Sequence, residues 1–210
     1  MAIVIVDYGM GNLKSVGHAF ARQGFAARVS SRPRDVETAQ GLVLPGVGAF
    51  GRAMENLQAR GLARLLQRKV REGTPFLGIC LGLQLLFEAS EEAPGVPGLG
   101  LLPGRVVRFQ GNFKIPLIGW NQLRLCRENP LFRDMEPQAY FYFVHSYYAV
   151  PAVEEDVLAL SHYGREFPAL VGRGNFFGLQ FHPEKSSREG LKIIENFGRL
   201  VTEHGDHPRH

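Results

Sequence analysis

The segment FLGICLGLQ, residues 76–84, joins a short apolar run to a helical pattern with no loop between them. The apolar run at 76–79 predicts a buried strand, and residues 81–89 predict a helix that starts directly after Cys80. A side chain on so sharp a turn projects above the sheet, while the residues two positions away on each side pack closely. Glycines at positions 78 and 82 suit that packing. The segment therefore predicts a nucleophile elbow with Cys80 at its tip.

The predicted position of Cys80 also favours reactivity. Its sulfur would lie at a helix N-terminus, whose partial positive charge favours the thiolate over the thiol. The backbone NH of Leu81, in the first turn, would be free to donate to an oxyanion. A small buried core cysteine is the alternative interpretation, which the flanking glycines disfavour. Cys126 has neither feature and is interpreted as structural.

The first half of the chain alternates strand patterns with helical patterns. Besides 76–79, strands are expected at residues 2–7, 27–30 and 41–44, and helices after Asn12 and at 49–60 and 62–71. This alternation predicts a parallel sheet covered by helices on both faces.

The second half is richer in strand patterns joined by short turns. Strands are expected at residues 106–109, 117–125, 140–144, 157–162, 169–171 and 176–181, and a closing helix at 187–201. Antiparallel or mixed strands should therefore extend one edge of the parallel sheet. We predict a single α/β domain over residues 1–203, followed by a polar, frayed tail at 204–210 whose three histidines are a weak alternative metal site.

Composition excludes several classes of protein. The 210 residues are 45% hydrophobic and 21% charged, which is ordinary for a globular domain. No apolar run reaches the ~20 residues that span a membrane, and the first residues are interpreted as a strand, not as a signal peptide. Two cysteines form no disulfide framework, which fits a reducing cytoplasm. The net charge of +4 is scattered, which disfavours nucleic-acid binding but would suit an acidic partner surface.

A base for the thiol is offered by QFHPE, residues 180–184, at the end of a predicted strand. Pro183 restricts the backbone, so the carboxylate of Glu184 could hold one ring nitrogen of His182 and leave the other facing sulfur. Alone the pattern is weak, but together with the cysteine elbow His182 is the best candidate base. His18 and His162 are interpreted as a surface helix residue and a strand or turn residue.

A third element, LPGVGAF at residues 44–50, also ends a predicted parallel strand. Its glycines allow unusual backbone dihedrals, so an NH group of Val47 or Gly48 could join that of Leu81 in an oxyanion hole. A plain turn is the alternative. A phosphate-binding loop is disfavoured because neither G-x-x-x-x-G-K-[ST] nor G-x-G-x-x-G occurs here. We expect no cofactor and no metal.

Together these three motifs resemble those of the class I (triad) glutamine amidotransferases, over nearly the whole chain. The resemblance implies a flavodoxin-like amidotransferase fold, a catalytic triad of Cys80, His182 and Glu184, and the oxyanion loop at residues 45–48. It further implies contacts with glutamine from Gly46, Gln84, Ser146 and Tyr147.

Five further segments are similar to the glutaminase subunits of imidazole glycerol phosphate synthases. They are DYGMGNL (7–13), PGVGAF (45–50), IGWN (118–121), YFVHSY (142–147) and HPEKS (182–186). This resemblance implies that ammonia passes to a (β/α)₈-barrel cyclase subunit of histidine biosynthesis, which makes imidazole glycerol phosphate and an aminoimidazole carboxamide ribotide. Candidate contacts with that partner are the segment Tyr8–Asn12, with Asn12 foremost, and Trp120, Tyr142 and Lys185. Two alternatives remain open: the glutaminase subunit of a pyridoxal phosphate synthase, and a non-catalytic thiol-bearing module on the same fold.

Overall fold

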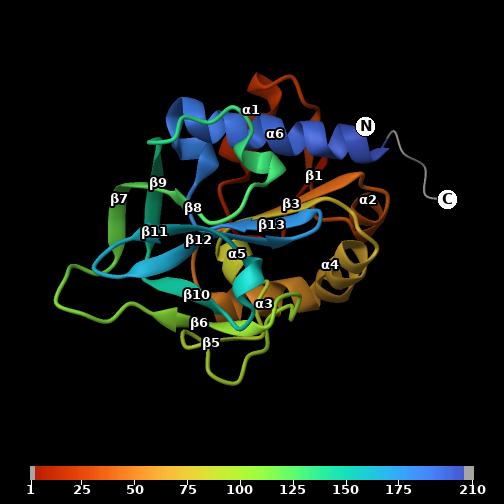
Figure 1. Ribbon diagram of the computed structural model, residues 1–210. Coiled ribbons are helices and arrows are strands. Elements are labelled where there is room, and N and C mark those ends of the chain that lie inside the picture. Colours follow the sequence, from red (N-terminus) through yellow and green to blue (C-terminus); the bar gives the residue numbers. More distant parts are fainter. Residues whose placement is uncertain (1–2, 206–210) are drawn as a thin grey trace.

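The computed structural model describes residues 3–205 and contains one large sheet, two small sheets and surrounding helices (Figure 1). The first half of the chain forms β1 (Ile3–Val6), α1 (Leu13–Arg22), β2 (Ala27–Ser30), α2 (Pro33–Glu37), β3 (Gly41–Gly46), α3 (Phe50–Ala59), α4 (Leu62–Arg71), β4 (Phe76–Cys80), α5 (Leu81–Gln84) and β5 (Ala89–Ser90). The second half forms β6 (Gly104–Arg108), β7 (Leu117–Gln122), β8 (Arg124–Leu125), η1 (Pro130–Phe132), β9 (Tyr140–His145), β10 (Tyr147–Pro151), η2 (Glu154–Asp156), β11 (Val157–His162), β12 (Glu166–Arg173), β13 (Phe176–Leu179), η3 (Pro183–Lys185) and α6 (Ser187–Gly205).

The large sheet has the strand order β2-β1-β3-β4-β13-β12-β11-β8. Its first five strands are parallel, and β12, β11 and β8 follow as antiparallel strands at one edge. The predicted mixed α/β sheet is therefore confirmed. Two features of the topology were not predicted. The strand β13, from the end of the chain, continues the parallel sheet, and five other strands form the small sheets β10-β6-β5 and β7-β9.

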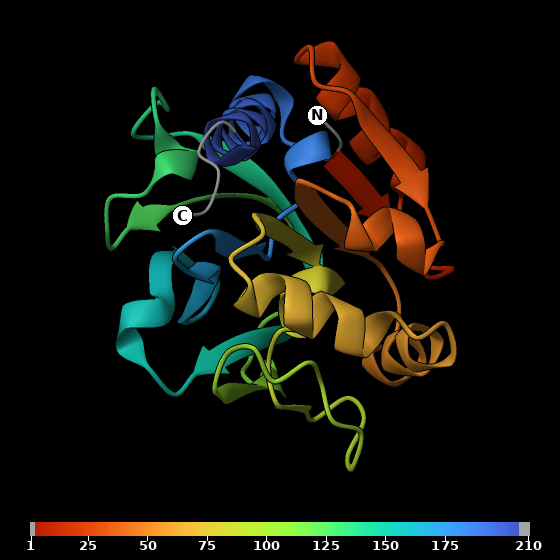
Figure 2. The same cartoon turned by 90° about the vertical axis from the view of Figure 1, so that its right-hand side faces the viewer.

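Both faces of the large sheet are buried. Side chains alternate along β1, so that Ile3 and Ile5 join the core beneath α1 and α6, while Val4 and Val6 join the core beneath α3 and α4. Figures 1 and 2 show these two helix layers on opposite faces of the sheet. The near-continuous apolar runs of the parallel strands follow from this double burial.

Two helices differ from their predicted lengths. The helix predicted at 81–89 ends at Gln84, because the carbonyls of Leu85 and Leu86 accept hydrogen bonds from the backbone of residues 99–102 instead. The final helix, predicted to end at Val201, continues to Gly205, so His204 and Gly205 are helical. The rest of the predicted tail, residues 206–210, lies outside the described residues.

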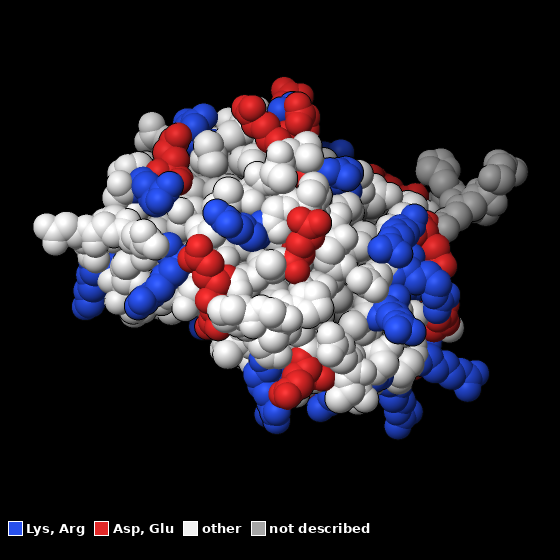
Figure 3. Space-filling view, turned by 90° about the horizontal axis from the view of Figure 1, so that it is seen from below, with Lys and Arg blue, Asp and Glu red and all other residues white. Residues whose placement is uncertain are grey.

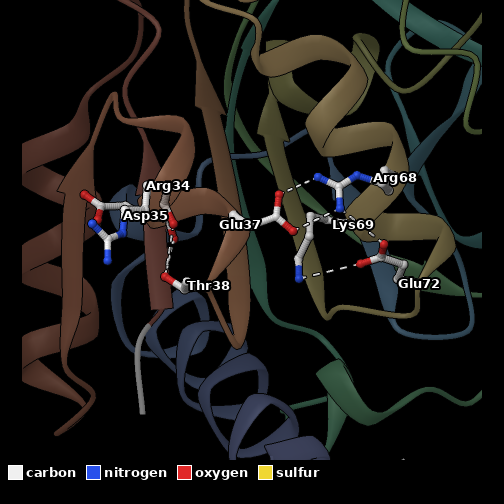
Figure 4. A network of polar contacts seen from close by, with 7 residues as sticks. All are labelled: Arg34, Asp35, Glu37, Thr38, Arg68, Lys69 and Glu72. Atoms are coloured by element: carbon white, nitrogen blue, oxygen red, sulfur yellow. Dashed lines mark hydrogen bonds and ion pairs between the residues drawn. The ribbon is translucent and has the colours of Figure 1, made fainter.

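The charged surface is mixed. Figure 3 shows one face on which basic side chains gather mainly towards the margins, while the centre carries isolated acidic groups among uncharged ones. Figure 4 shows a network that joins two helices: Arg68 of α4 donates to the carboxylate of Glu37 on α2 and lies near Glu72, which also pairs with Lys69. These partners are substantially exposed apart from Lys69, so the network contributes little to stability.

No helix within residues 3–205 is long and apolar enough to cross a membrane.

Candidate active site

The carboxyl ends of neighbouring parallel strands meet at one point of the large sheet, where ligands bind in open α/β folds. Cys80 is the last residue of β4 and lies beside Gly46, the last residue of β3. On the other side of β4, β13 ends at Leu179, and the chain continues to His182 three residues later. The topology thus brings together three motifs that are far apart in sequence.

Cys80 occupies a backbone conformation that is rare for a residue with a side chain, with φ of 56° and ψ of −106°. The glycines on either side are required sterically. A Cβ at position 82 would lie 1.8 Å from the carbonyl oxygen of Leu44, and one at position 78 would lie 2.6 Å from that of Gly82. The predicted elbow is therefore present, and its strained cysteine is held by close backbone packing.

His182 is fixed by its backbone as well as by its ring. Its NH donates to the carbonyl of Tyr142 at 3.0 Å, and its own carbonyl accepts from the hydroxyl of Ser186 at 2.6 Å. The same hydroxyl accepts from the NH of Tyr142 at 2.9 Å, so Tyr142 of β9 fixes the backbone of His182 both directly and through Ser186. The ring nitrogen Nδ1 lies 2.9 Å from Oε1 of Glu184, and both side chains are almost fully buried.

The surroundings of His182 favour the imidazolium. Burial alone would lower its pKa, but the Cys80 thiol and the Glu184 carboxylate outweigh that effect and raise the pKa to about 9. Nε2 is buried and has no hydrogen-bond partner among the described residues. The arrangement matches a base that is oriented by a carboxylate through one nitrogen and has the other free for sulfur and substrate.

A pocket of about 320 Å³ opens in front of the thiol. Its lining residues are Val47, Gly48, Cys80, Leu81, Gln84, Glu92, Val144, His145, Ser146, Tyr147 and His182. The lining thus contains every residue predicted for the oxyanion hole and all those predicted for substrate binding except Gly46. Gly46 lies behind the pocket, where a Cβ would be 2.5 Å from the hydroxyl of Tyr8.

The oxyanion segment combines exposure with backbone freedom. Val47 is 43% exposed and Gly48 has a φ of 105°, a value that favours glycine. Leu81 opens α5, so its NH has no partner four residues earlier within the helix. Because α5 has only four residues, however, its dipole contributes less to thiolate stabilisation than the predicted nine-residue helix would.

Three residues at the site were not identified as functional candidates from the sequence: Glu92, His145 and Gln180. Tyr8, expected at the partner face, is instead buried beside Gly46. Glu92 lines the pocket, and its Oε2 accepts from the NH of Phe50 at the start of α3, at 2.8 Å. No motif marks this residue, because it lies in an irregular loop among other acidic residues. Gln180 does carry a signal, since it opens the QFHPE motif, and its amide reaches the sulfur of Cys80.

His145 is a neutral imidazole in this environment. Burial lowers its pKa to about 4, against the opposing effect of the Tyr147 carbonyl. The ring packs against Phe109, Phe143 and Phe167, and its Nδ1 lies 2.8 Å from the Tyr147 carbonyl oxygen. Because a carbonyl only accepts, Nδ1 carries the proton. His145 thereby holds the turn that presents Ser146 and Tyr147 to the pocket.

Three of the predicted partner contacts lie together on the outer face of the β7-β9 sheet. Trp120 packs edge-on against Tyr142 with ring centroids 5.8 Å apart, and Nζ of Lys185 lies 5.8 Å from the centre of the Tyr142 ring. Ile118 and Tyr140 extend this exposed apolar face. Asn12 instead caps α1, where its side chain accepts from the NH of Ser15.

Among residues 3–205 there is no group of three or more His, Cys, Asp or Glu side chains that could hold a metal ion.

A cysteine elbow, a carboxylate-oriented histidine and a glycine-rich loop on an open α/β sheet define a thiol amidohydrolase site of the triad type. The family model for class-I glutamine amidotransferases matches residues 4–200, and the chain belongs to this family. A solved structure described as a glutamine amidotransferase covers 95% of this chain and 98% of its own, with a TM-score of 0.76 and 21% identity, which shows the shared fold.

Within the family, the chain is similar to one kind of subunit. It is 52% identical, over 97% of both chains, to the imidazole glycerol phosphate synthase subunit HisH of Moorella thermoacetica. It is 50% identical to the subunit of the same name from Geobacillus kaustophilus, over 97% of this chain and 99% of that one.

Proposed function

We propose that this chain is the glutaminase subunit of an imidazole glycerol phosphate synthase, with its amidotransferase domain over residues 1–203 and its place of action in the cytoplasm. The observation that carries the proposal is the pairing of Cys80 and His182 at one pocket, with Glu184 bound to the Nδ1 atom of His182, in a chain about half identical to subunits of that name. The same relatives disfavour the pyridoxal phosphate synthase alternative, and the triad geometry disfavours a non-catalytic module.

The proposed reaction begins with the thiolate of Cys80, which attacks the side-chain amide carbon of glutamine. The carbonyl oxygen becomes an oxyanion, which NH groups of Leu81 and of Val47 or Gly48 stabilise. His182 gives its proton to the departing nitrogen, so ammonia leaves and a glutamyl thioester remains. His182 then takes a proton from water, which attacks the thioester and releases glutamate. Glu184 orients the ring and favours its protonated form.

The pocket also provides for the amino-acid end of glutamine. We assign Gln84, Ser146 and Tyr147 to this end, with Gly46 shaping the loop behind it. Glu92 has one oxygen committed to the start of α3, and its carboxylate lies at a pocket that must accept the α-ammonium group. A carboxylate there would distinguish glutamine from simple amides through a charge-assisted hydrogen bond.

Ammonia must reach its acceptor unprotonated, because ammonium is not a nucleophile. The proposal therefore includes a partner, the (β/α)₈-barrel cyclase subunit, which uses the ammonia to make imidazole glycerol phosphate and an aminoimidazole carboxamide ribotide. The exposed face of Trp120, Tyr142 and Lys185, with Asn12, is the proposed contact surface. The Gly46–Gly48 segment, in which Val47 and Gly48 are exposed, is the proposed switch that completes the oxyanion hole when the liganded partner is bound.

The test is glutamate release by the chain alone, with the cyclase subunit, and with the cyclase subunit and its ligand. We expect low turnover alone and a large increase in the liganded complex. Cys80→Ala should lose glutamine-dependent product by at least about 10³-fold, yet support product formation when an ammonium salt replaces glutamine. Equal turnover in all three conditions, or full glutamine-dependent activity of Cys80→Ala, would refute the proposal.

A further inference from the structure

A chain of hydrogen bonds leads from the backbone of β10 to the sulfur of Cys80 through two buried glutamines. The Nε2 atom of Gln84 donates to the Tyr147 carbonyl oxygen at 3.0 Å and to Oε1 of Gln180 at 3.2 Å. The Nε2 atom of Gln180 donates to Sγ of Cys80 at 3.9 Å. Gln180 is fully buried and directly follows β13, where its NH is bonded to the Ala169 carbonyl at 2.9 Å.

The direction of this chain is determined by its fixed end. The Tyr147 carbonyl can only accept, so the Gln84 atom that faces it must be the amide nitrogen. That nitrogen can only donate, so the Gln180 atom that faces it must be the amide oxygen. The remaining atom of the Gln180 amide, its NH₂ group, therefore faces the sulfur. The usual ambiguity between oxygen and nitrogen in a glutamine side chain is removed by the network itself.

The orientation matters because the sulfur is buried and α5 is short. Cys80 is only 6% exposed, and burial in an apolar environment opposes ionisation of a thiol. The four residues of α5 supply little dipole to offset it. An amide N–H that points at sulfur binds a thiolate more strongly than a thiol, because the acceptor then carries a full charge.

We propose that Gln180, held in one orientation by Gln84, is a further catalytic residue that donates a hydrogen bond to the Cys80 thiolate. This inference rests on Cys80 being the nucleophile of the proposed function. Gln84 is a positioning residue for the donor in addition to its assigned substrate contact. The hydrogen bond between Gln84 and Gln180 explains why these two long polar side chains can be buried near the elbow. Each of them alone would lack some of its hydrogen-bond partners.

Other titratable groups face the same sulfur or pocket. They are His182 after β13, Tyr8 after β1, His145 at the end of β9 and Glu92 in the loop before β6, while Glu184 acts on the pocket only through its bond to His182. Because His182 lines the same pocket as the thiol, a pH profile of sulfur reactivity reflects both groups. Removal of the Gln180 donor should therefore move the whole profile without adding or deleting a titrating group.

The test is the pH dependence of Cys80 alkylation by iodoacetamide in the full-length chain. A Cys126→Ser background removes the other, exposed thiol. Gln180→Met keeps the length of the side chain but has no donor, and the midpoint of the profile should rise by about one unit. Gln180→Glu replaces the donor with an acceptor and should raise the midpoint further.

The matched control is Gln67→Met, which removes an amide that donates to the Leu99 carbonyl at 2.7 Å, remote from the thiol. Its midpoint should equal that of the unmodified background. Circular dichroism checks folding. If Gln180→Met does not fold, Gln84→Met decides, because loss of the orienting donor lets the Gln180 amide rotate and should also raise the midpoint.

An unchanged midpoint in folded Gln180→Met, or in Gln84→Met if that variant decides, would overturn the inference. This outcome differs from failure of the proposed function, in which the unmodified chain with its liganded partner would release no glutamate.

Discussion

Cys80 has a backbone conformation that is unfavourable for a residue with a side chain, and the packing of its neighbours holds it in that conformation. Its positive φ is held by Gly78 and Gly82, which pack against each other and against β3. The consequence is a thiol at the floor of a pocket, close to an imidazole and to an amide donor. The position of this thiol thus depends on the whole backbone turn. The spacing of Gly78 and Gly82 indicates that turn in the sequence.

The first residue-scale prediction concerns pH. Because Glu184 helps to raise the pKa of His182 to about 9, Glu184→Gln should lower that pKa. The imidazolium that protonates departing ammonia would then be lost at a lower pH. We expect the alkaline limb of the glutaminase profile to move to lower pH, with kcat reduced by about 10²-fold or more. The measurement is kcat against pH in the liganded complex. Glu189→Gln is the control, and an unmoved alkaline limb in Glu184→Gln would contradict the assigned role.

The same shift has a consequence for stability. Since folding raises the pKa of His182 from about 6.5 to about 9, its stabilising contribution is complete below pH 6.5 and is lost as the pH rises through 9. Urea unfolding at several pH values should show that decline in the unmodified chain, and His182→Gln should lack this part of it.

The second residue-scale prediction concerns Glu92. Glu92→Gln keeps an oxygen for the Phe50 NH but removes the charge that we assign to the α-ammonium group. The KM for glutamine should rise about tenfold or more, while kcat changes little, because the lost contact is remote from the reacting amide. Steady-state kinetics of Glu92→Gln beside Glu91→Gln measures this. A KM equal to that of the unmodified enzyme would argue against the assignment.

Some residues of the site could be predicted from the sequence, whereas others became evident only in the structure. The proximity of Cys80, His182 and Glu184 could be predicted because each lies in a motif with a steric or chemical reason for its spacing. Glu92 could not, since it reaches the pocket through a loop whose path depends on contacts with α3. Gln180 lies inside a recognised motif, but its role follows only from the orientation that Gln84 imposes.

At the scale of elements, the backbones of β3, β4 and α5 are in direct contact at the elbow, with no side chains between them. The carbonyl of Leu44 on β3 occupies the space that a Cβ at position 82 would need. The parallel strands and their helices could be predicted from hydrophobic patterns. The early end of α5 could not be predicted, because the carbonyls of Leu85 and Leu86 accept hydrogen bonds from residues 99–102, which follow much later in the chain.

This packing leads to a prediction for Gly82→Ala. The added methyl group would collide with the backbone of β3, and the backbone of β3 cannot move aside without disturbing the sheet. The free energy of unfolding should fall by about 3 kcal/mol or more. Gly17→Ala, in α1 where a Cβ would be 3.7 Å from Ile5, should instead stabilise the protein by about 0.5–1 kcal/mol. Urea denaturation of both variants decides, and a Gly82→Ala variant as stable as the parent would contradict the steric account.

At the scale of the whole molecule, the active site and the proposed partner surface are joined by β9. Tyr142 of this strand binds the backbone of His182, while its ring lies between Trp120 and Lys185 on the exposed face. Hydrophobic patterns predicted this strand, but they could not show that the aromatic side chains on its outer face are partly exposed. That feature depends on the pairing of β7 with β9 in a sheet of their own.

The exposed face supports a prediction about assembly. Trp120 is 47% exposed and packs on Tyr142, which is the kind of aromatic anchor that dominates protein interfaces. Trp120→Ala should weaken binding of the cyclase subunit about tenfold or more, as measured by isothermal titration calorimetry. Leu125→Ala, which removes a similarly exposed apolar side chain on β8, should leave the affinity unchanged. Equal affinities for the two variants would show that the partner binds elsewhere.

The role of Cys80 as the nucleophile is tested most directly by its covalent capture. The liganded complex would be treated with a glutamine analogue that carries a chloroketone in place of the side-chain amide, and the modified peptide identified by mass spectrometry. We expect one adduct, on Cys80, whose formation is slowed by glutamine and lost in Cys80→Ala. Labelling of Cys126 instead, or labelling of Cys80 that glutamine does not slow, would contradict this role of Cys80.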